Sequence, residues 1–99
     1  FLMVRHFVCW TLKEEARANK AALAAELREK FHALLGVVDG LTAIELGENY
    51  NGGAYDLALL CTFTTREAEQ GYQNHPAHLA IKAIVQQNTC GRASVDYEL

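Results

Sequence analysis

The spacing of hydrophobic residues predicts four strands. Residues 4–12 alternate with a period of two and are rich in β-branched and aromatic side chains, which is typical of a strand. Both faces of this segment carry apolar residues, so we expect it to be covered on both sides. Residues 41–49, 55–63 and 92–99 show the same kind of pattern and predict three further strands.

The period changes to that of a helix in two places. Between residues 13 and 35, apolar residues recur at steps of three, four or seven and form one stripe, made of Ala16, Leu23, Leu27, Phe31 and Leu34. Thr64 and Glu67 have the spacing of a capping box, which opens a second, short helix. Pro76 then restarts the helix at its first turn. The segment that follows, residues 76–87, is apolar nearly all round, so we expect it to pack deeply.

The predicted order is strand, helix, two strands, helix, strand. This is the α+β, ferredoxin-like βαββαβ arrangement, in which four strands form one antiparallel sheet and the helices cover one of its faces. The other face also looks apolar, although the helices cannot cover it. A second sheet from a partner subunit is the simplest cover, so we expect a homodimer that forms a dimeric α/β barrel.

Length and charge limit the classes of function. The chain has 99 residues and a net charge of −3, and 51% of its residues are hydrophobic. This fits one domain, which we expect to cover residues 3–99, with Met3 as the natural start and residues 1–2 as leftovers of an added or upstream segment. No cluster of Lys and Arg occurs, so we expect no nucleic-acid partner. Arg5 and His6 interrupt the apolar start, so we expect neither a signal peptide nor a membrane partner.

The three cysteines, Cys9, Cys61 and Cys90, are an odd number without metal-like spacing. Cys9 and Cys61 lie inside apolar strand patterns, where a free cysteine behaves as a small buried hydrophobic residue. Nothing suggests a disulfide framework, so we expect a reducing compartment, the cytoplasm. No flavin or haem motif is visible, and we expect no cofactor.

Five sets of residues form one series that spans nearly the whole chain. They are the first strand Val4–Trp10, Gly40–Leu41 with Glu45–Asn49, Tyr55–Leu59 with Phe63, Tyr72–His78, and the ending Val95–Glu98. In this order they resemble the stress-responsive A/B-barrel (Dabb) family. The resemblance implies a dimeric α/β barrel in which two sheets face each other. It implies no single activity, because many bacterial members have none assigned, some plant members are linked to stress, and one plant member is a polyketide cyclase.

The resemblance also implies roles for three residues. The cyclase uses a Tyr and a His from a Tyr…His-Pro-x-His segment for aldol chemistry, and these fall on Tyr72 and His78 here. The family's first-strand His falls on His6. The cyclase carries another His on its third strand, where this chain has Leu57.

These residue types suit acid–base chemistry. A histidine titrates near neutral pH, so His78 is the candidate base. Tyr72 could donate a hydrogen bond to a developing enolate oxygen. We expect Tyr72, His78 and His6 to converge on one partly enclosed pocket. The alternative is structural: His75 and His78 would bond loop carbonyls at a helix start, and Tyr72 and His6 would belong to the core.

We expect His75, Leu27, Phe31 and Trp10 to contact a ligand. His75 and His78 are three residues apart, but without a third ligand they do not predict a metal site.

Three functions remain open. The first, which we favour, is a small dimeric protein that holds an apolar ligand between sheet and helices. The second is a cofactor-independent cyclase or lyase that acts on a polyketide-like carbonyl compound. The third is an interaction module that uses the barrel face to dimerise and for nothing else.

Overall fold

The structure, a computed structural model, describes residues 3–99 and confirms the predicted order of the elements. The expectation about residues 1–2 lies outside this described range. The elements are β1 (Val4–Leu12), α1 (Glu14–Arg17), α2 (Lys20–His32), β2 (Leu41–Glu48), β3 (Leu57–Phe63), α3 (Arg66–Asn74), α4 (Pro76–Asn88) and β4 (Thr89–Glu98).

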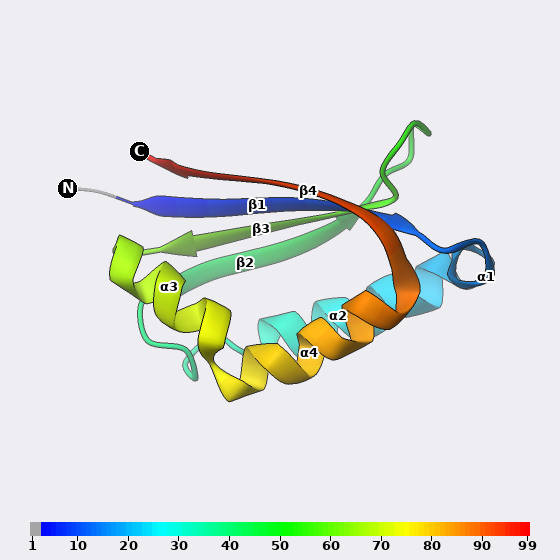
Figure 1. The fold of residues 1–99 in the computed structure, drawn as a ribbon. Helices are drawn as coiled ribbons and strands as arrows, with labels where there is room; N and C mark the ends of the chain where they lie inside the picture. The colour runs from blue at the N-terminus through cyan, green and yellow to red at the C-terminus, as the bar shows by residue number, and fades with distance from the viewer. Residues whose placement is uncertain (1–2) are drawn as a thin grey trace.

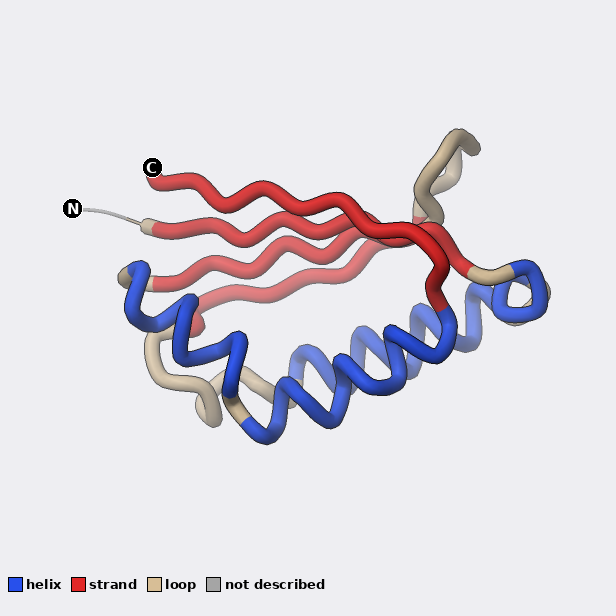
Figure 2. The backbone as a smooth tube through the Cα atoms, viewed as in Figure 1, coloured by secondary structure: helices blue, strands red, loops and turns tan. Residues whose placement is uncertain are grey.

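The sheet and the helices form two layers (Figure 1). The strands pair antiparallel in the order β2-β3-β1-β4, so β1 and β3 are central while β2 and β4 form the edges. Figure 2 shows the helices together on one side of the sheet. The predicted ferredoxin-like fold is therefore confirmed. Within residues 3–99, no helix is both long enough and apolar enough to cross a membrane.

The hydrophobic core fills the space between the two layers. Alternate residues of β1, from Val4 to Leu12, point toward the helices and are buried. The alternate residues of β3, from Leu57 to Phe63, point the same way and are also buried. Every member of the predicted helix stripe is also buried. The two periodicities of the sequence therefore identified the core correctly, because side-chain direction follows backbone period.

The sheet face opposite the helices, called here the open face, is also apolar. In the register of the sheet, Phe7 of β1 lies between Leu60 of β3 and Val95 of β4. Such cross-strand partners share one face of a sheet. Phe7 and Tyr97 are each 37% exposed in the single chain, and Val95 is 58% exposed. A contiguous apolar patch of this kind is typical of a surface that binds another protein.

The first helical segment differs from the prediction of one helix over residues 13–35. α1 ends at Arg17, and α2 begins at Lys20 after a non-helical Asn19 with φ −118° and ψ 31°. The N–H of Asn19 bonds to the carbonyl of Ala16, three residues back, and so interrupts the helical pattern of four. Periodicity misses this break because the apolar stripe faces the sheet on both sides of it.

Three predictions for the second half of the chain were wrong in detail. Thr65 rather than Thr64 caps α3, since its side chain accepts a hydrogen bond from the backbone N–H three residues on. The last strand begins at Thr89 and not at residue 92. α4 is not buried all round, because Leu79 on its outer side is 45% exposed.

Candidate functional site

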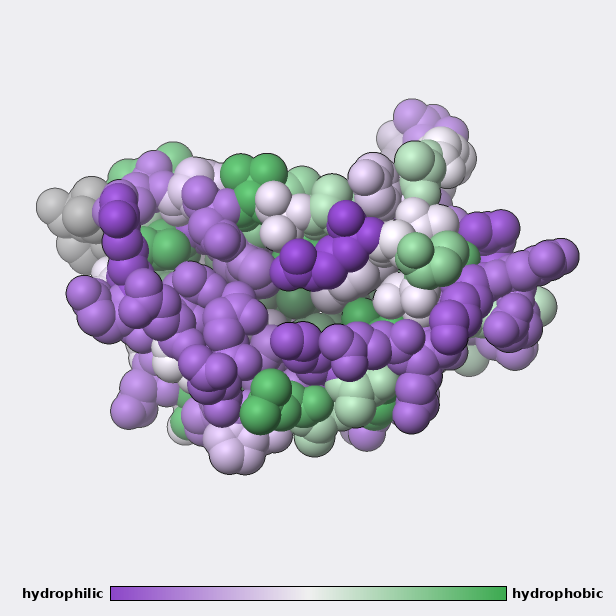
Figure 3. Space-filling view, viewed as in Figure 1, coloured by the Kyte–Doolittle hydropathy of each residue, from purple (hydrophilic) through white to green (hydrophobic). Residues whose placement is uncertain are grey.

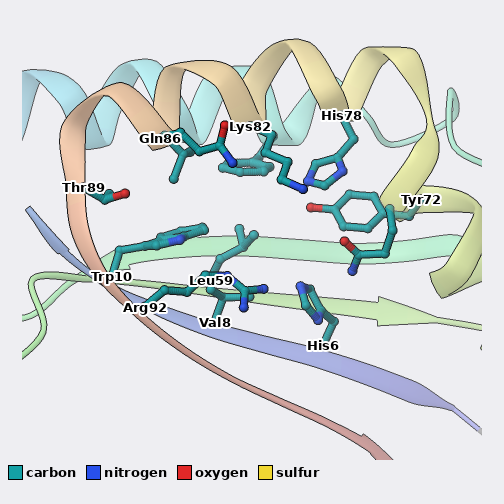
Figure 4. Close-up of a pocket in the computed structure, with 13 residues that line it drawn as sticks. His6, Val8, Trp10, Leu59, Tyr72, His78, Lys82, Gln86, Thr89 and Arg92 are labelled. Atoms are coloured by element: carbon teal, nitrogen blue, oxygen red, sulfur yellow. The ribbon is translucent and has the colours of Figure 1, made fainter.

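A pocket of about 380 Å³ lies between the sheet and α4. Figure 3 shows a hollow on this side of the molecule, with hydrophilic borders and hydrophobic surface inside. Figure 4 shows the side chains that line the pocket, from β1, α2, β3, α3, α4 and β4. The lining residues are His6, Val8, Trp10, Phe31, Leu59, Tyr72, Gln73, His78, Lys82, Val85, Gln86, Thr89 and Arg92.

The floor of the pocket is apolar and belongs to the core. The rings of Trp10 and Phe31 stack with their centroids 6.3 Å apart and an angle of 16° between their planes. Val8 and Leu59 add aliphatic surface from the sheet, and Val85 adds it from α4. All five side chains are buried. Because close-packed core residues hold their positions, this floor gives the pocket a fixed shape.

The break between α3 and α4 brings Tyr72 and His78 together. After α3 ends, His75 takes an extended conformation with φ −67° and ψ 132°, and Pro76 opens α4. Nδ1 of His75 accepts a hydrogen bond of 3.1 Å from the backbone N–H of Ala77 and thereby caps α4. This turn stacks the rings of Tyr72 and His78 with their centroids 4.0 Å apart.

His78 is a buried ring, 8% exposed, whose Nδ1 carries no hydrogen bond among residues 3–99. Burial is the main cause that lowers the pKa of His78 below its usual 6.5, and the charges of Lys82 and His6 act in the same direction. The carbonyls of Gln73 and Tyr72 oppose this shift, although neither bonds Nδ1. The ring is therefore neutral at pH 7 and able to accept a proton.

Tyr72 keeps its hydroxyl proton. Its side chain is fully buried, and this burial raises the pKa of the hydroxyl above its ordinary value. The positive charge of Arg92 acts in the opposite direction. The Sγ of Cys61 lies 3.9 Å from the Tyr72 hydroxyl, and burial raises the pKa of that thiol to about 12. Tyr72 can thus serve as a hydrogen-bond donor in the pocket, while Cys61 stays a neutral thiol.

His6 is paired with an acidic residue on the neighbouring strand. Its Nδ1 lies 2.5 Å from Oδ1 of Asp96, which faces it in the pairing of β1 with β4. The His6 ring stands edge-on to Tyr72 with the ring centroids 6.1 Å apart. One ligand atom each from His6, Asp96 and Glu69 lie within 4.8 Å of one another, a spacing that a metal ion could bridge. In the sequence, the only histidines at a spacing that two metal ligands could share are His75 and His78, and the three residues of this group are too far apart along the chain to suggest a site.

The structure brings five of the seven residues proposed from the sequence to the pocket. The five that line it are His6, Trp10, Phe31, Tyr72 and His78. Leu27 and His75 are not among the lining residues. Leu27 is buried in the core, and His75 uses its ring to cap α4. The expectation that both would contact a ligand therefore has no support in the geometry of the pocket.

Several polar lining residues were missed. Lys82 and Gln86 follow His78 at steps of four along α4, so helical spacing places all three on one face of the helix. Arg92 lies opposite Trp10 in the pairing of β1 with β4. The helical spacing was visible in the sequence, whereas the strand pairing was not, because only the folded register shows which residues of two distant strands lie side by side.

The fold and the pocket define a ferredoxin-like α+β domain with a cavity of small-molecule size. The sequence model of the stress responsive A/B barrel domain, Dabb, matches residues 4–99. The chain belongs to the Dabb family, as the resemblance predicted.

Solved structures show the same fold. A dimeric protein of unknown function with a ferredoxin-like fold from Bacteroides fragilis NCTC 9343 is 30% identical, with a TM-score of 0.85 and coverage of 98% of this chain and 96% of that chain. A dimeric ferredoxin-like protein of unknown function from Jannaschia sp. CCS1 is 25% identical, with a TM-score of 0.83 and coverage of 98% and 99%. The hydroxynitrile lyase from Passiflora edulis shares the fold at 13% identity, with a TM-score of 0.79 and coverage of 98% and 93%. No curated protein matches the sequence of this chain.

Proposed function

We propose that this Dabb-domain protein binds a small, largely apolar ligand in the pocket between its sheet and its helices. The observation that carries the proposal is a cavity of about 380 Å³ whose floor is apolar and whose wall presents His6, Tyr72 and His78. Ligand pockets in proteins have this size and this combination of apolar surface with a few convergent polar groups. A filled interior would instead have favoured the interaction module.

Fluorescence of Trp10 tests this proposal, because Trp10 is the single tryptophan of the chain and lines the pocket. Titration with octanamide, a neutral amphiphile without an aromatic ring, should change the emission in a saturable way. Val85→Phe fills the pocket from α4 and should abolish this change. Leu79→Phe places the same aromatic ring on the exposed side of α4 and should leave the change in emission intact. A wild-type protein that gives no saturable signal with any amphiphile of this chain length would contradict the proposal, and so would a signal that Val85→Phe does not reduce.

We also propose that two copies pair through the open face, so that two sheets enclose a barrel. The exposed apolar side chains of Phe7, Val95 and Tyr97 support this pairing. The relatives from Bacteroides fragilis and Jannaschia are described as dimeric. Sedimentation should give about twice the chain mass of 11.0 kDa, and a folded monomer at micromolar concentration would exclude the barrel.

A cytoplasmic location is the last part of this proposal. Cys9, Cys61 and Cys90 are all free thiols, which suits a reducing compartment. Cell fractionation tests the location, and recovery of the protein from an oxidising compartment would contradict it.

A second function, cofactor-independent chemistry on a carbonyl compound, is favoured by one observation. His78 presents a neutral ring whose buried Nδ1 has no partner among residues 3–99, and it lies directly against Tyr72. In this reaction His78 would take a proton from the carbon next to a carbonyl group, and the electron pair would move to the carbonyl oxygen. Tyr72 would stabilise that oxygen by a hydrogen bond.

Proton exchange separates catalysis from binding alone. The wild-type protein should accelerate exchange of the α-protons of 2-octanone in D₂O, followed by NMR. His78→Gln should lose about 10²–10⁴-fold in rate, while octanamide still binds. Exchange at the buffer rate, with octanamide bound normally, would rule out the catalytic function and leave the binding function standing.

A further inference from the structure

The pocket carries positive charge in a protein that is acidic overall. The chain has 12 acidic and 9 basic residues and a net charge of −3. Among residues 3–99, the charged side chains that line the pocket are Lys82 from α4 and Arg92 from β4, and no Asp or Glu lines it. The local charge is therefore opposite in sign to the charge of the whole chain.

The two cations are not neutralised by neighbours. Within the described residues, neither Lys82 nor Arg92 forms an ion pair, and the one side-chain hydrogen bond of Arg92 goes to the neutral Oγ of Ser94 at 3.1 Å. Acidic groups do lie close to the pocket, but each is already bonded to a side chain that lines it. Asp96 bonds His6, and Glu69 accepts a hydrogen bond of 2.6 Å from a side-chain amide of α3.

The cations flank the end of the pocket that holds Tyr72 and His78 from two sides. Figure 4 shows Lys82 reaching from α4 beside His78 and Tyr72, while Arg92 projects from β4 on the side of the sheet. The charge of Lys82 acts on the pKa of His78, and the charge of Arg92 lowers the pKa of Tyr72 against the larger, opposite effect of Glu69. The apolar floor formed by Trp10 and Phe31 lies in the same pocket. The pocket thus offers one apolar surface and one cationic, hydrogen-bonding end.

From this arrangement we infer that the ligand is an amphipathic acid, with an apolar body on the floor and a carboxylate held between Lys82 and Arg92. The inference rests on the proposed binding function and names the chemical class of its ligand. Arg92 suits a carboxylate because a guanidinium can bond both carboxylate oxygens at once. Lys82 adds a compact charge, and the neutral hydroxyl of Tyr72 adds a hydrogen-bond donor for negatively charged oxygen atoms.

A series of ligands of one length and three charges tests the inference. Octanoate, octanamide and octylammonium share an apolar chain and differ in the charge of the head group. At low ionic strength, octanoate should bind at least about tenfold more tightly than octanamide, the effect of one charge-assisted contact. Octylammonium should bind most weakly. Added salt should reduce the advantage of octanoate, because it screens charges that lie near the surface.

Variants assign the effect to the two cations. Lys82→Gln and Arg92→Gln should each lower the affinity for octanoate toward that for octanamide, while the affinity for octanamide stays unchanged. Lys30→Gln removes an exposed charge from α2, outside this pocket, and serves as the matched control that leaves both affinities as they are. Circular dichroism of each variant verifies that it is folded.

The possible outcomes distinguish a wrong ligand class from a wrong binding function. Equal affinities for octanoate and octanamide would overturn the anionic ligand but leave the pocket proposal intact. A preference for octanoate that neither Lys82→Gln nor Arg92→Gln reduces would also overturn the anionic ligand at this site, because the carboxylate would then be recognised elsewhere on the protein. If none of the three ligands binds, the proposed binding function itself fails, and the inference fails with it.

Discussion

Replacement of Phe7 by alanine is the sharpest test of the open face. Phe7 is 37% exposed in the single chain and sits at the centre of the sheet, between Leu60 and Val95. A partner sheet would cover this exposed part. The change removes apolar surface from the interface while it leaves the helix-covered core of each subunit untouched, so it should weaken the dimer far more than the fold.

The size of the effect follows from the exposed area. A phenylalanine buries roughly 200 Å² when it is fully covered, so 37% of that area is about 70 Å² for Phe7. At about 25 cal/mol per Å² this amounts to roughly 1.8 kcal/mol for each subunit, or about 1.5 kcal/mol once the remaining alanine is counted. A symmetric dimer loses this contribution twice, about 3 kcal/mol, which is roughly a hundredfold weaker dimer.

Sedimentation equilibrium over a dilution series measures the dissociation constants of the wild-type protein and of Phe7→Ala. Tyr50→Ala is the matched control, because Tyr50 is an aromatic residue that is 95% exposed in the loop between β2 and β3. This control should leave the dissociation constant unchanged. If Phe7→Ala dimerises as strongly as the wild type, or if the control weakens the dimer equally, the open face is not the interface.

Three further predictions concern stability and reactivity. The pKa of His78 is lowered in the folded state, so the unfolded chain binds the proton more readily. Urea denaturation should therefore show that the free energy of unfolding falls as the pH drops below about 6.5. In His78→Gln this fall should be smaller. Gly36→Ala should lower the free energy of unfolding by about 1–2 kcal/mol, because Gly36 has a positive φ. Gly40→Ala should lower it by about 1–3 kcal/mol more than Gly36→Ala does, because the added Cβ would lie 2.5 Å from a side chain of α3. Calorimetry that finds equal losses for the two variants would refute the clash. Alkylation at about pH 8 should modify the exposed Cys90 and spare Cys61 until the protein unfolds, because Cys61 is buried and its pKa is raised. If mass spectrometry finds both cysteines modified at the same rate, Cys61 is accessible in the folded protein.

The fold could be predicted from the sequence because the periodic spacing of apolar residues is repeated along the chain. The alternation from Val4 to Leu12 and the stripe around Phe31 each involve many residues, so one atypical residue does not hide the pattern. The break at Asn19 and the early start of β4 at Thr89 involve one turn each. They depend on a single backbone hydrogen bond or on pairing with β1, neither of which leaves a periodic trace.

The candidate site was predictable only in part, for a related reason. Tyr72 and His78 are close in the sequence, so the proline between them already indicated that their side chains could meet. Asp96 and Arg92 belong to a strand about 80 or more residues away from β1, and only the register of the folded sheet places them opposite His6 and Trp10. Lys82 is different, since its spacing from His78 was visible and was not used.

The double use of Trp10 and Phe31, as core and as pocket floor, constrains how this protein can evolve. A mutation there that changes which ligand body fits also removes buried packing, at a cost of several kcal/mol of stability. The exposed side chains of Lys82, Gln86 and Arg92 can change with little effect on folding. Among the descendants of this sequence, the preferred head group of the ligand should therefore diversify sooner than the shape of its apolar body.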